Sequence, residues 1–458
     1  MSNLMRDNGS FWFASLDDSE DIASPEWPEQ VDVAIIGGGY TGLWTAYYLQ
    51  KARPELSIAV FEAEHFGFGA SGRNGGWCMG TSHDVEHLLQ QPDRQPIGVR
   101  LAREMQSTVD EIGRVSASLG IDCHFHKGGN LTVATRSFQL RQFEDEVRHL
   151  HKLGFDEADF RLLTPSESCD RVGMTDNFGA LYTSHCAVIH PARLAQGLAR
   201  SVKNAGVNCQ PNTRVLGYQS GQVATDRGVV RAGRILRATE GFTETIKGCE
   251  RQVLPIYSMM ISTEPLPNSV WARIGLAGRE TFADPRRVVI YGQRTADDRI
   301  AFGGRGGYYY GSDIKPIIDS DHPNLDAISE TLRSLFPVLR DYKVTHRWGG
   351  PLGVHRHWRP TVEFDADTGL GSAGGYVGEG VAASNLAARI LTDLVLGEQT
   401  PLTDLPWVND VSRRWEAEPI RFFGTKAVEF LAERGDASEW QRNQPSKVWG
   451  RLFDVLTR

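Results

Sequence analysis

Residues 31–62 read VDVAIIGGGYTGLWTAYYLQKARPELSIAVFE, and this stretch decides the fold of the domain around it. An apolar run at 31–36 enters the glycine turn 37–42, apolar residues at helical spacing follow, and a second apolar run at 58–61 ends at Glu62. A strand, a GxGxxG turn, a helix and a second strand with a terminal acid form the unit that binds dinucleotides. An ordinary glycine turn in an α/β domain is the alternative, and the position of the acid argues against it.

Each residue of this unit has a physical role in holding a dinucleotide. Gly37 permits the tight turn, Gly39 lets the backbone approach a pyrophosphate, and Gly42 allows the helix to pack close to the strand. The helix that begins near Thr41 directs its free N–H groups toward the phosphates. Glu62, twenty residues beyond Gly42, can accept hydrogen bonds from both hydroxyls of an adenosine ribose. The unit alone does not distinguish NAD from FAD.

Two further glycine-rich segments favour a flavin. Residues 69–76 read GASGRNGG, and their small side chains would let the backbone meet a phosphate or a planar ring. Residues 374–385 read GGYVGEGVAASN, where a helix N-terminus aimed at the flavin N1/O2 edge would stabilise reduced flavin. Each segment could also be an ordinary structural turn. Together they indicate FAD and give these candidate binding residues: Gly37, Gly39, Tyr40, Thr41, Gly42, Glu62, Ala63, Gly69, Ala70, Ser71, Arg73, Asn74, Gly75, Gly76, Gly375, Tyr376, Gly378, Glu379, Gly380 and Val381.

Length and composition narrow the class of protein. The chain has 458 residues, more than one ordinary hydrophobic core encloses, so two joined domains are expected. A net charge of −8 gives no basic surface for nucleic acid. The N-terminus lacks a signal-peptide core, and no apolar window has the length of a membrane span. The six cysteines lack metal-type spacing, so we expect reduced thiols, no metal site and a cytoplasmic protein without membrane contact.

The order of predicted elements indicates a discontinuous architecture. Helical patterns, such as the one at 97–119, alternate with strand-like runs, such as a predicted hairpin at 123–134 and separate short strands at 229–231 and 235–239. We expect an α/β protein, α+β overall, in which a Rossmann-like FAD-binding domain carries an inserted, mostly antiparallel β-sheet substrate domain. The predicted segments are an irregular lead-in at 1–30 that docks through Phe11, Trp12 and Phe13, the FAD-binding segments 31–115, 185–250 and 350–400, the substrate-binding segments 116–184 and 251–349, and a helical tail at 401–458.

The motifs resemble those of the glycine oxidase/D-amino acid oxidase (DAO) family of FAD-dependent amine oxidases. The resemblance covers about residues 30–400, and it is strongest to the bacterial gamma-glutamylputrescine oxidase-like branch. The fold it implies is the same FAD-binding domain with an inserted β-sheet domain. The matching set is GGGYTG at 37–42, Glu62, GASGRNGGW at 69–77, ATEG at 238–241 and GYVGEGVAASN at 375–385.

The resemblance implies a reaction and a mode of cofactor attachment. The family oxidises a C–N bond of an amine or amino acid, such as glycine or an N-substituted glycine, by hydride transfer to flavin N5. Imine hydrolysis and reoxidation by O2, giving H2O2, complete the cycle. Relatives with covalent FAD use a histidine near the second motif or a cysteine in the C-terminal third. Here the region of the second motif contains Arg73 and Asn74, and no cysteine follows Cys249 in the chain. We therefore predict that FAD is bound noncovalently.

Candidate substrate-site residues precede the third motif. In amino-acid-oxidising relatives an Arg-Pro pair clamps the substrate carboxylate, and Arg359-Pro360 matches that pattern. A surface arginine is the alternative. His355 and His357 alternate, so on a strand they would share one face, and either could supply positive charge, although a metal site would lack a third ligand. The aromatic candidates, which simple core packing would also explain, are Trp348, Tyr291 and Tyr308.

Chemistry of this kind depends on orientation and electrostatics, so the sequence assigns no catalytic acid or base. A dehydrogenase with an acceptor other than O2, a noncatalytic flavin-binding redox module and a nicotinamide-dependent enzyme are the alternatives. The expected partners are a small amine or amino acid and O2. The sequence identifies neither the amine nor the oligomeric state.

Overall fold

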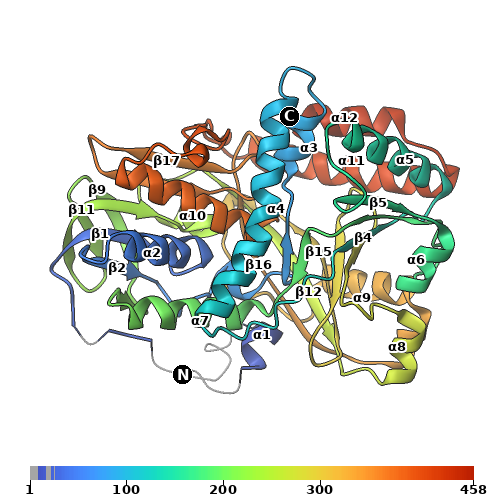
Figure 1. Cartoon of the computed structure of the whole chain (residues 1–458), viewed down its shortest axis with the longest axis horizontal. Coiled ribbons are helices and arrows are strands. Elements are labelled where there is room, and N and C mark those ends of the chain that lie inside the picture. The colour runs from blue at the N-terminus through green and yellow to red at the C-terminus, as the bar shows by residue number, and fades with distance from the viewer. Residues whose placement is uncertain (1–8, 17–21, 25, 458) are drawn as a thin grey trace.

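The computed structural model describes residues 9–16, 22–24 and 26–457, and two eight-stranded sheets form its framework (Figure 1). In the first sheet the strand order is β17-β18-β11-β1-β2-β8, and β9 and β10 extend it from β11. All neighbouring pairs from β18 to β8 are parallel, whereas β17 runs antiparallel to β18. The strands are β1 (Gln30–Ile36), β2 (Ile58–Phe61), β8 (Asn208–Gln210), β9 (Val215–Gln219), β10 (Gln222–Thr225), β11 (Val229–Arg237), β17 (Thr361–Asp365) and β18 (Leu370–Gly374).

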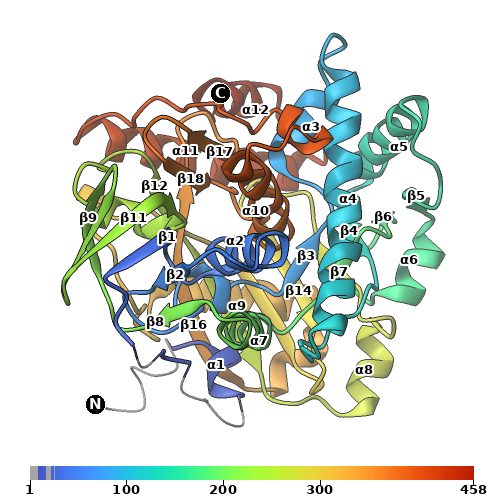
Figure 2. The ribbon, with the colours of Figure 1, turned by 60° about the vertical axis from the view of Figure 1, so that its left-hand side comes forward.

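Helices cover one face of this sheet and a β-meander covers the other. α2 (Tyr40–Ala52) packs between α7 (Pro191–Asn204) and α10 (Gly380–Leu396), and α4 (Gln95–Ser118) packs against α10 (Figure 2). On the opposite face, Val215 of β9 and Val223 of β10 join an apolar core. Both faces are therefore buried, which explains why β1 and β2 are almost continuously apolar.

The second sheet is mostly antiparallel, with the order β16-β12-β15-β14-β13-β4-β6-β5. Only the β13–β4 pair is parallel. One face packs against α8 (Asn268–Ile274) and α9 (Pro323–Leu335). The strands are β4 (Asn130–Val133), β5 (Phe160–Leu163), β6 (Ala180–Thr183), β12 (Leu254–Thr263), β13 (Thr281–Ala283), β14 (Ile290–Arg294), β15 (Ile300–Gly307) and β16 (Val344–Val354). The predicted fold class is confirmed, whereas the exact domain boundaries stay a prediction.

Two local predictions are wrong. The hairpin at 123–134 does not form, because residues 123–127 contribute only an isolated bridge from His126 to Val188. β4 forms alone and pairs with β6 and β13. The runs predicted as separate strands around 229–239 form one strand, β11, since the pairing with β1 continues from Arg231 to Arg237.

The N-terminal segment bridges the two sheets. The predicted lead-in at 1–30 lies partly outside the described residues, but α1 (Phe11–Ala14) is described. Phe11 and Trp12 are buried and pack with Met260 and Trp348 of the second sheet. Trp12 Nε1 donates to the carbonyl of Asn74 at 2.8 Å, so α1 also holds the second glycine motif.

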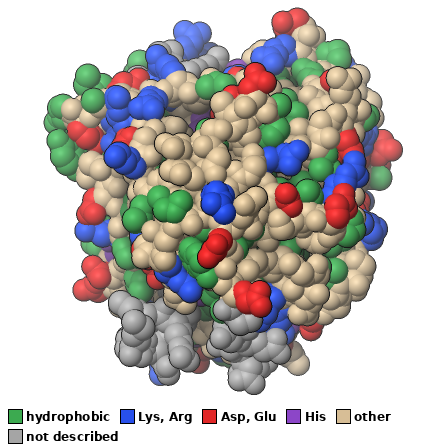
Figure 3. All heavy atoms as spheres, turned by 90° about the vertical axis from the view of Figure 1, so that its left-hand side faces the viewer, with side chains coloured by type: hydrophobic (Ala, Val, Ile, Leu, Met, Phe, Trp, Pro, Cys, Tyr) green, Lys and Arg blue, Asp and Glu red, His purple; other side chains and the backbone are tan. Residues whose placement is uncertain are grey.

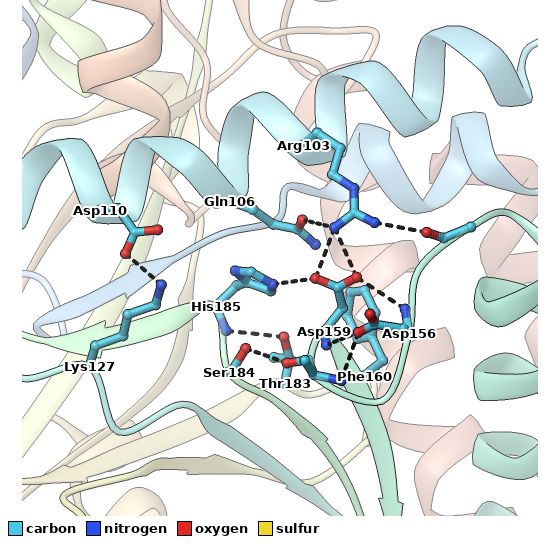
Figure 4. Close-up of polar contacts among 12 residues, drawn as sticks. Arg103, Gln106, Asp110, Lys127, Asp156, Asp159, Phe160, Thr183, Ser184 and His185 are labelled. Atoms are coloured by element: carbon cyan, nitrogen blue, oxygen red, sulfur yellow. Dashed lines mark hydrogen bonds and ion pairs between the residues drawn. The ribbon is translucent and has the colours of Figure 1, made fainter.

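A polar cluster ties α4 to the second sheet (Figure 4). Arg103 of α4 donates to both carboxylate oxygens of Asp159 at 2.8 Å, and His185 Nε2 lies 2.7 Å from Asp159 Oδ1. Burial opposes ionisation of Asp159, but hydrogen bonds from His185, the Asp156 N–H and Arg103 outweigh it and lower the pKa of Asp159. This fixed charge pair positions α4 between the two sheets.

The remaining helices lie at the periphery. α11 (Ile420–Arg442) and α12 (Lys447–Thr457) form the predicted C-terminal helical tail, coloured red in Figure 1. The backbone N–H groups of Arg287 and Val288 each donate to Asp436 of α11 at 2.9 Å. The smaller elements are α3 (His83–Leu89), α5 (Ser137–Lys152), α6 (Pro165–Arg171), and the two-stranded sheet of β3 (Trp77–Met79) and β7 (Cys186–Val188).

The surface carries side chains of both charges. On the face in Figure 3, basic and acidic side chains are interspersed. In the part of the chain that the structure describes, no helix combines the length and apolar character of a bilayer span. Within the same residues no cluster of three or more His, Cys, Asp or Glu side chains is placed to hold a metal ion.

Candidate functional site

A cavity of about 290 Å³ opens at the carboxyl ends of β1, β2 and β11. Ligands of open α/β sheets bind at this edge, so the position itself marks a binding site. Residues from both sheets enclose the cavity, with Pro316 and Pro351 contributed from the side of the second sheet. The predicted cofactor residues in its wall are Gly37, Gly39, Tyr40, Thr41, Glu62, Ala63, Gly69, Ala70 and Ser71.

The first glycine motif forms the turn between β1 and α2. Gly37 has a φ of 107°, and a Cβ there would overlap the carbonyl oxygen of Ala238. Gly42 does not line the cavity; a Cβ on it would overlap the carbonyl oxygen of Gly37. Gly42 therefore permits the close approach of α2 to the strand end, in the packing role assigned to it from the sequence.

The Glu62 carboxylate is fixed at the end of β2. Its Oε2 accepts from the Gly38 N–H at 2.8 Å, and its Oε1 accepts from the Glu64 N–H at 3.0 Å. Burial raises the pKa of Glu62 against the opposing effect of these two N–H donors. These two bonds fix the rotamer of Glu62, and its role as the acceptor for the hydroxyls of a ribose stays a prediction.

The second motif closes over the first. The Tyr40 N–H donates to Ser71 Oγ at 2.8 Å, and a Cβ on Gly39 would lie 2.8 Å from the same oxygen. Asn74 holds the loop by donating from Nδ2 to the Ala70 and Ser71 carbonyls. Small residues thus allow two backbone segments to meet at the helix N-terminus, where a phosphate binds most favourably.

The rest of the second motif lies behind the cavity wall. Arg73 is buried, and its guanidinium donates to the carbonyls of Pro316 and Gly349. Burial lowers the pKa of Arg73 to about 10, and its Nη2 has no hydrogen-bond partner in the described structure. Gly75 and Gly76 pack against Tyr291 and Gln293, so they join the loop to β14. The predicted cofactor contacts of Arg73, Asn74, Gly75 and Gly76 stay predictions.

Sequence reasoning left the contacts of Glu240 open, and the structure places this residue in the cavity wall. Its carboxylate accepts from the N–H groups of Gly353 at 2.8 Å, Gly375 at 3.1 Å and Tyr376 at 3.2 Å. Burial raises the pKa of Glu240 to about 7, although the three N–H donors oppose it. The sequence shows an acidic residue within the ATEG motif, but the residues that donate their N–H groups to it lie more than a hundred residues away in the chain.

The third motif reaches the first through side chains. Thr41 Oγ1 and Tyr376 Oη are 2.9 Å apart, so the turn before α10 contacts the start of α2. The N–H groups of Gly375 and Tyr376 bind Glu240, and α10 itself begins at Gly380. None of the six third-motif candidates is among the residues that line this cavity; they are Gly375, Tyr376, Gly378, Glu379, Gly380 and Val381. Their direct contact with FAD stays a prediction.

The candidate substrate residues form two groups, the aromatic residues of the second sheet and the residues that precede the third motif, which are His355, His357 and Arg359. His355 packs against Gly375, while His357 and Arg359 face Asp410, with Arg359 Nη2 2.7 Å from Asp410 Oδ2. Burial, the neighbouring His357 and Arg237 lower the pKa of His355 to about 3, so it is neutral and provides no positive charge. The Arg359 clamp stays a prediction, in which a substrate carboxylate would have to displace Asp410.

The aromatic candidates line one face of the second sheet. Trp348 and Tyr291 pack in the cluster around α1, and Tyr291 Oη is hydrogen-bonded to Ser258 Oγ. Tyr308 lies farther along, where its hydroxyl donates to Glu418 and its ring packs with Trp415. Residues of α1 therefore cover Trp348 and Tyr291, and Trp415 of the C-terminal segment covers Tyr308.

The residues present fit an FAD group. The cavity combines a glycine turn at a helix N-terminus, an acid fixed at the end of β2, and a second glycine loop that a side chain at Gly39 would obstruct. The adenosine end would rest at Glu62, and the pyrophosphate at the start of α2. Fold and site together define an FAD-dependent oxidoreductase.

Comparison with known proteins gives the same result. The chain belongs to the DAO family of FAD-dependent oxidoreductases, whose family model matches residues 32–394. It is 30% identical over 385 residues to the probable oxidoreductase OrdL of Rhizobium meliloti, an alignment covering 81% of this chain and 85% of that protein. It is 29% identical over 379 residues to the gamma-glutamylputrescine oxidoreductase of Escherichia coli, covering 80% and 84%.

A solved structure supports the fold. The structure of glycine oxidase from Geobacillus kaustophilus superposes with a TM-score of 0.71 at 18% identity, covering 85% of this chain and 100% of that one. The predictions of the family, of FAD as cofactor and of an oxidoreductase are thereby confirmed.

Proposed function

We propose that this protein oxidises the C–N bond of a small amine or amino acid and passes the electrons to O2. The observation that carries the proposal is the cavity at the strand ends, which meets the second sheet at Pro351 of β16. An FAD bound from Glu62 onward would extend toward that sheet. The gamma-glutamylputrescine oxidoreductase and glycine oxidase named above, both similar to this chain, support amines as the substrate class.

FAD, when bound, supplies a hydride acceptor and passes the electrons on to dioxygen, with hydrogen peroxide as the product. The contribution of the chain is to hold and orient. Glu62 would hold the ribose, and the start of α2 would hold the phosphates. No described side chain needs to act as a general base, provided that the amine arrives uncharged.

The cofactor is proposed to be noncovalent. The loop 69–76 contains no histidine, and no cysteine follows Cys249 in the chain. Denaturation of the purified protein should therefore release all the flavin into a protein-free filtrate. Flavin that stays with the precipitated chain would contradict this part of the proposal.

The acceptor is tested by stoichiometry. In air, the oxidase should form one molecule of hydrogen peroxide for each molecule of amine consumed. If the flavin is reduced by the amine but stays reduced in air, the protein is a dehydrogenase with another acceptor. If no amine reduces the flavin, the proposed amine chemistry is wrong and a noncatalytic flavin module becomes the better account.

A further inference from the structure

Glu240 lies where the cofactor cavity meets the second sheet. It lines the cavity, and the Gly353 N–H of β16 donates to its carboxylate at 2.8 Å. A Cβ on the next residue, Gly241, would lie 2.9 Å from the carbonyl oxygen of Pro351, so this turn packs directly on β16. The adenosine end of FAD is predicted at the end of β2, in the first sheet. Glu240 therefore belongs to the part of the cavity toward which a bound FAD would extend.

The Glu240 carboxylate fills an anion site of the third glycine motif. The N–H groups of Gly375 and Tyr376 follow one another in the chain and converge on its Oε1, at 3.1 and 3.2 Å. Gly375 has a φ of 81°, and turns with such a residue direct successive N–H groups toward one acceptor. The sequence predicts that this motif stabilises reduced flavin by offering positive charge to its N1/O2 edge. In the structure, two N–H groups of the motif instead bind a carboxylate of the chain itself.

The chain holds this carboxylate in place at a cost to its backbone. Glu240 has a φ of 44°, in the left-handed region where residues other than glycine are uncommon. A Cβ on Gly353 would overlap the Glu240 Oε2 atom, so β16 leaves open the space that the carboxylate occupies. Strained residues of this kind cluster at ligand sites, and surrounding contacts hold them there. The position of Glu240 is therefore a built feature of the cavity wall.

Among the described residues, no cation forms an ion pair with Glu240. Arg237 of β11 attracts the carboxylate and lowers its pKa, against the larger effect of burial. Its guanidinium, however, donates to Thr243 at 2.8 Å and to Gln252 at 3.0 Å. The charge of Glu240 is thus opposed by three backbone N–H groups and by a more distant arginine.

The other titratable groups around Glu240 do not offset its charge near neutral pH. Burial and neighbouring positive groups lower the pKa of His355 to about 3, so its ring beside Gly375 is neutral. Burial raises the pKa of the Tyr376 hydroxyl, which therefore stays protonated. Glu244, on the same turn as Glu240, faces Arg421 at 3.6 Å. A change in the charge of Glu240 is therefore not compensated by these neighbours.

We propose that Glu240 is a positioning residue that makes the bound FAD harder to reduce, because its carboxylate occupies N–H groups that would otherwise stabilise the reduced flavin. Reduction adds two electrons and one proton to the flavin, which leaves a negative charge on the ring at neutral pH. A carboxylate in the cavity wall opposes that charge. When Glu240 takes up a second proton from the solvent, the opposition is removed. The inference rests on FAD as the cofactor and does not depend on an amine as the electron donor.

Equilibration of the FAD-loaded protein with a reference dye measures this effect without any amine. At a fixed dye potential, the absorbance gives the ratio of reduced to oxidised flavin. A unit charge acting over about 10 Å at an effective dielectric constant of about 20 changes an equilibrium about tenfold. Glu240→Gln should therefore raise the ratio about tenfold at about pH 9, where the wild-type carboxyl is charged. At about pH 6, where the wild-type carboxyl is protonated, the ratio should change less than about twofold.

Glu240→Asp separates the charge from the contacts. Aspartate is one methylene shorter, so it loses N–H bonds, as glutamine does, but it keeps the negative charge. Its ratio should stay within about threefold of the wild type at both pH values. Glu64→Gln is the matched control, since Glu64 lines the same cavity and pairs with Arg214 at 2.8 Å on the surface. This control should change the ratio less than about threefold.

Three results would overturn the proposal. The first is an equal ratio in the wild type and Glu240→Gln at about pH 9. The second is an effect of Glu240→Gln that is the same at both pH values. The third is an effect that Glu240→Asp reproduces, because loss of the contacts alone would then explain it.

The wild type alone provides a second measurement, which stands even if Glu240→Gln does not retain FAD. Each proton taken up on reduction makes the ratio fall tenfold per pH unit at a fixed potential. With Glu240 taking up a proton beside that of the flavin, the ratio should fall about thirtyfold between about pH 7 and about pH 8. A fall of about tenfold or less would show that no second proton is taken up and would overturn the proposal.

Discussion

Substitution of Glu62 by Gln tests the assignment of the adenosine end. Both carboxylate oxygens accept backbone N–H groups, from Gly38 at 2.8 Å and from Glu64 at 3.0 Å. An amide presents one acceptor and one donor, so one of these N–H groups would face an NH2 group. The ribose would also lose a charged acceptor, and a hydrogen bond to a charged group contributes about 1.5–3 kcal/mol. The Kd for FAD should therefore rise about tenfold to 150-fold.

The assay is a titration of the apoprotein with FAD, followed by flavin fluorescence at mildly alkaline pH. The matched control is Glu64→Gln, because Glu64 lies in the same cavity wall and its carboxylate pairs with Arg214 at 2.8 Å on the surface. An exposed pair contributes little, so this control should change the Kd less than about threefold. An unchanged Kd in Glu62→Gln, or equal losses in both variants, would refute the ribose assignment.

Three other substitutions probe the loop, the buried carboxyl and the clamp. Trp12→Ala removes a side chain that is 1% exposed and should lower the free energy of unfolding by about 3–5 kcal/mol. Trp12→Phe keeps an aromatic ring but loses the bond to Asn74 and part of the packing, so its loss should be clearly smaller; equal losses in both variants would contradict the packing role of Trp12. Burial raises the pKa of Glu240 to about 7. Between the ordinary glutamate pKa and pH 7, the folded apoprotein therefore keeps the proton of Glu240, whereas the unfolded chain has lost it. Its free energy of unfolding should fall by about 2 kcal/mol as pH rises from about 4.5 to about 7, and an equal fall in Glu240→Gln would show that another group is responsible. Arg359→Ala should raise KM for carboxylate-bearing substrates by a factor equivalent to about 1.5–3 kcal/mol, with no effect on amines that lack a carboxylate; an unchanged KM would leave Arg359 as only the partner of Asp410.

Much of the fold could be predicted because its signals are local. The sequence 31–62 contains a strand, a turn, a helix and an acid within one contiguous unit, and the structure forms β1, α2 and β2 there. The positions of Gly37 and Gly42 follow from backbone sterics, which depend on few neighbours. The long helix α4 was predictable for a similar reason, since its buried apolar residues repeat at helical spacing from Leu101 to Val115.

The missed features depend on contacts between distant segments. Residues 123–127 look like a strand, but a strand requires a partner, and the partner segment supplies only one bridge, at Val188. The environment of Glu240 is built by β16 and by the turn before α10, so nothing near it in the sequence reveals its donors.

We propose that this FAD-dependent oxidoreductase takes electrons from the C–N bond of an amine. Anaerobic mixing of the purified, flavin-loaded protein with a panel of amines and amino acids tests it most directly. At least one amine should bleach the visible flavin absorbance, and the matching aldehyde, ketone or keto acid should appear in equal amount. A flavin that keeps its full absorbance with every amine, yet is reduced by dithionite, would contradict the claim.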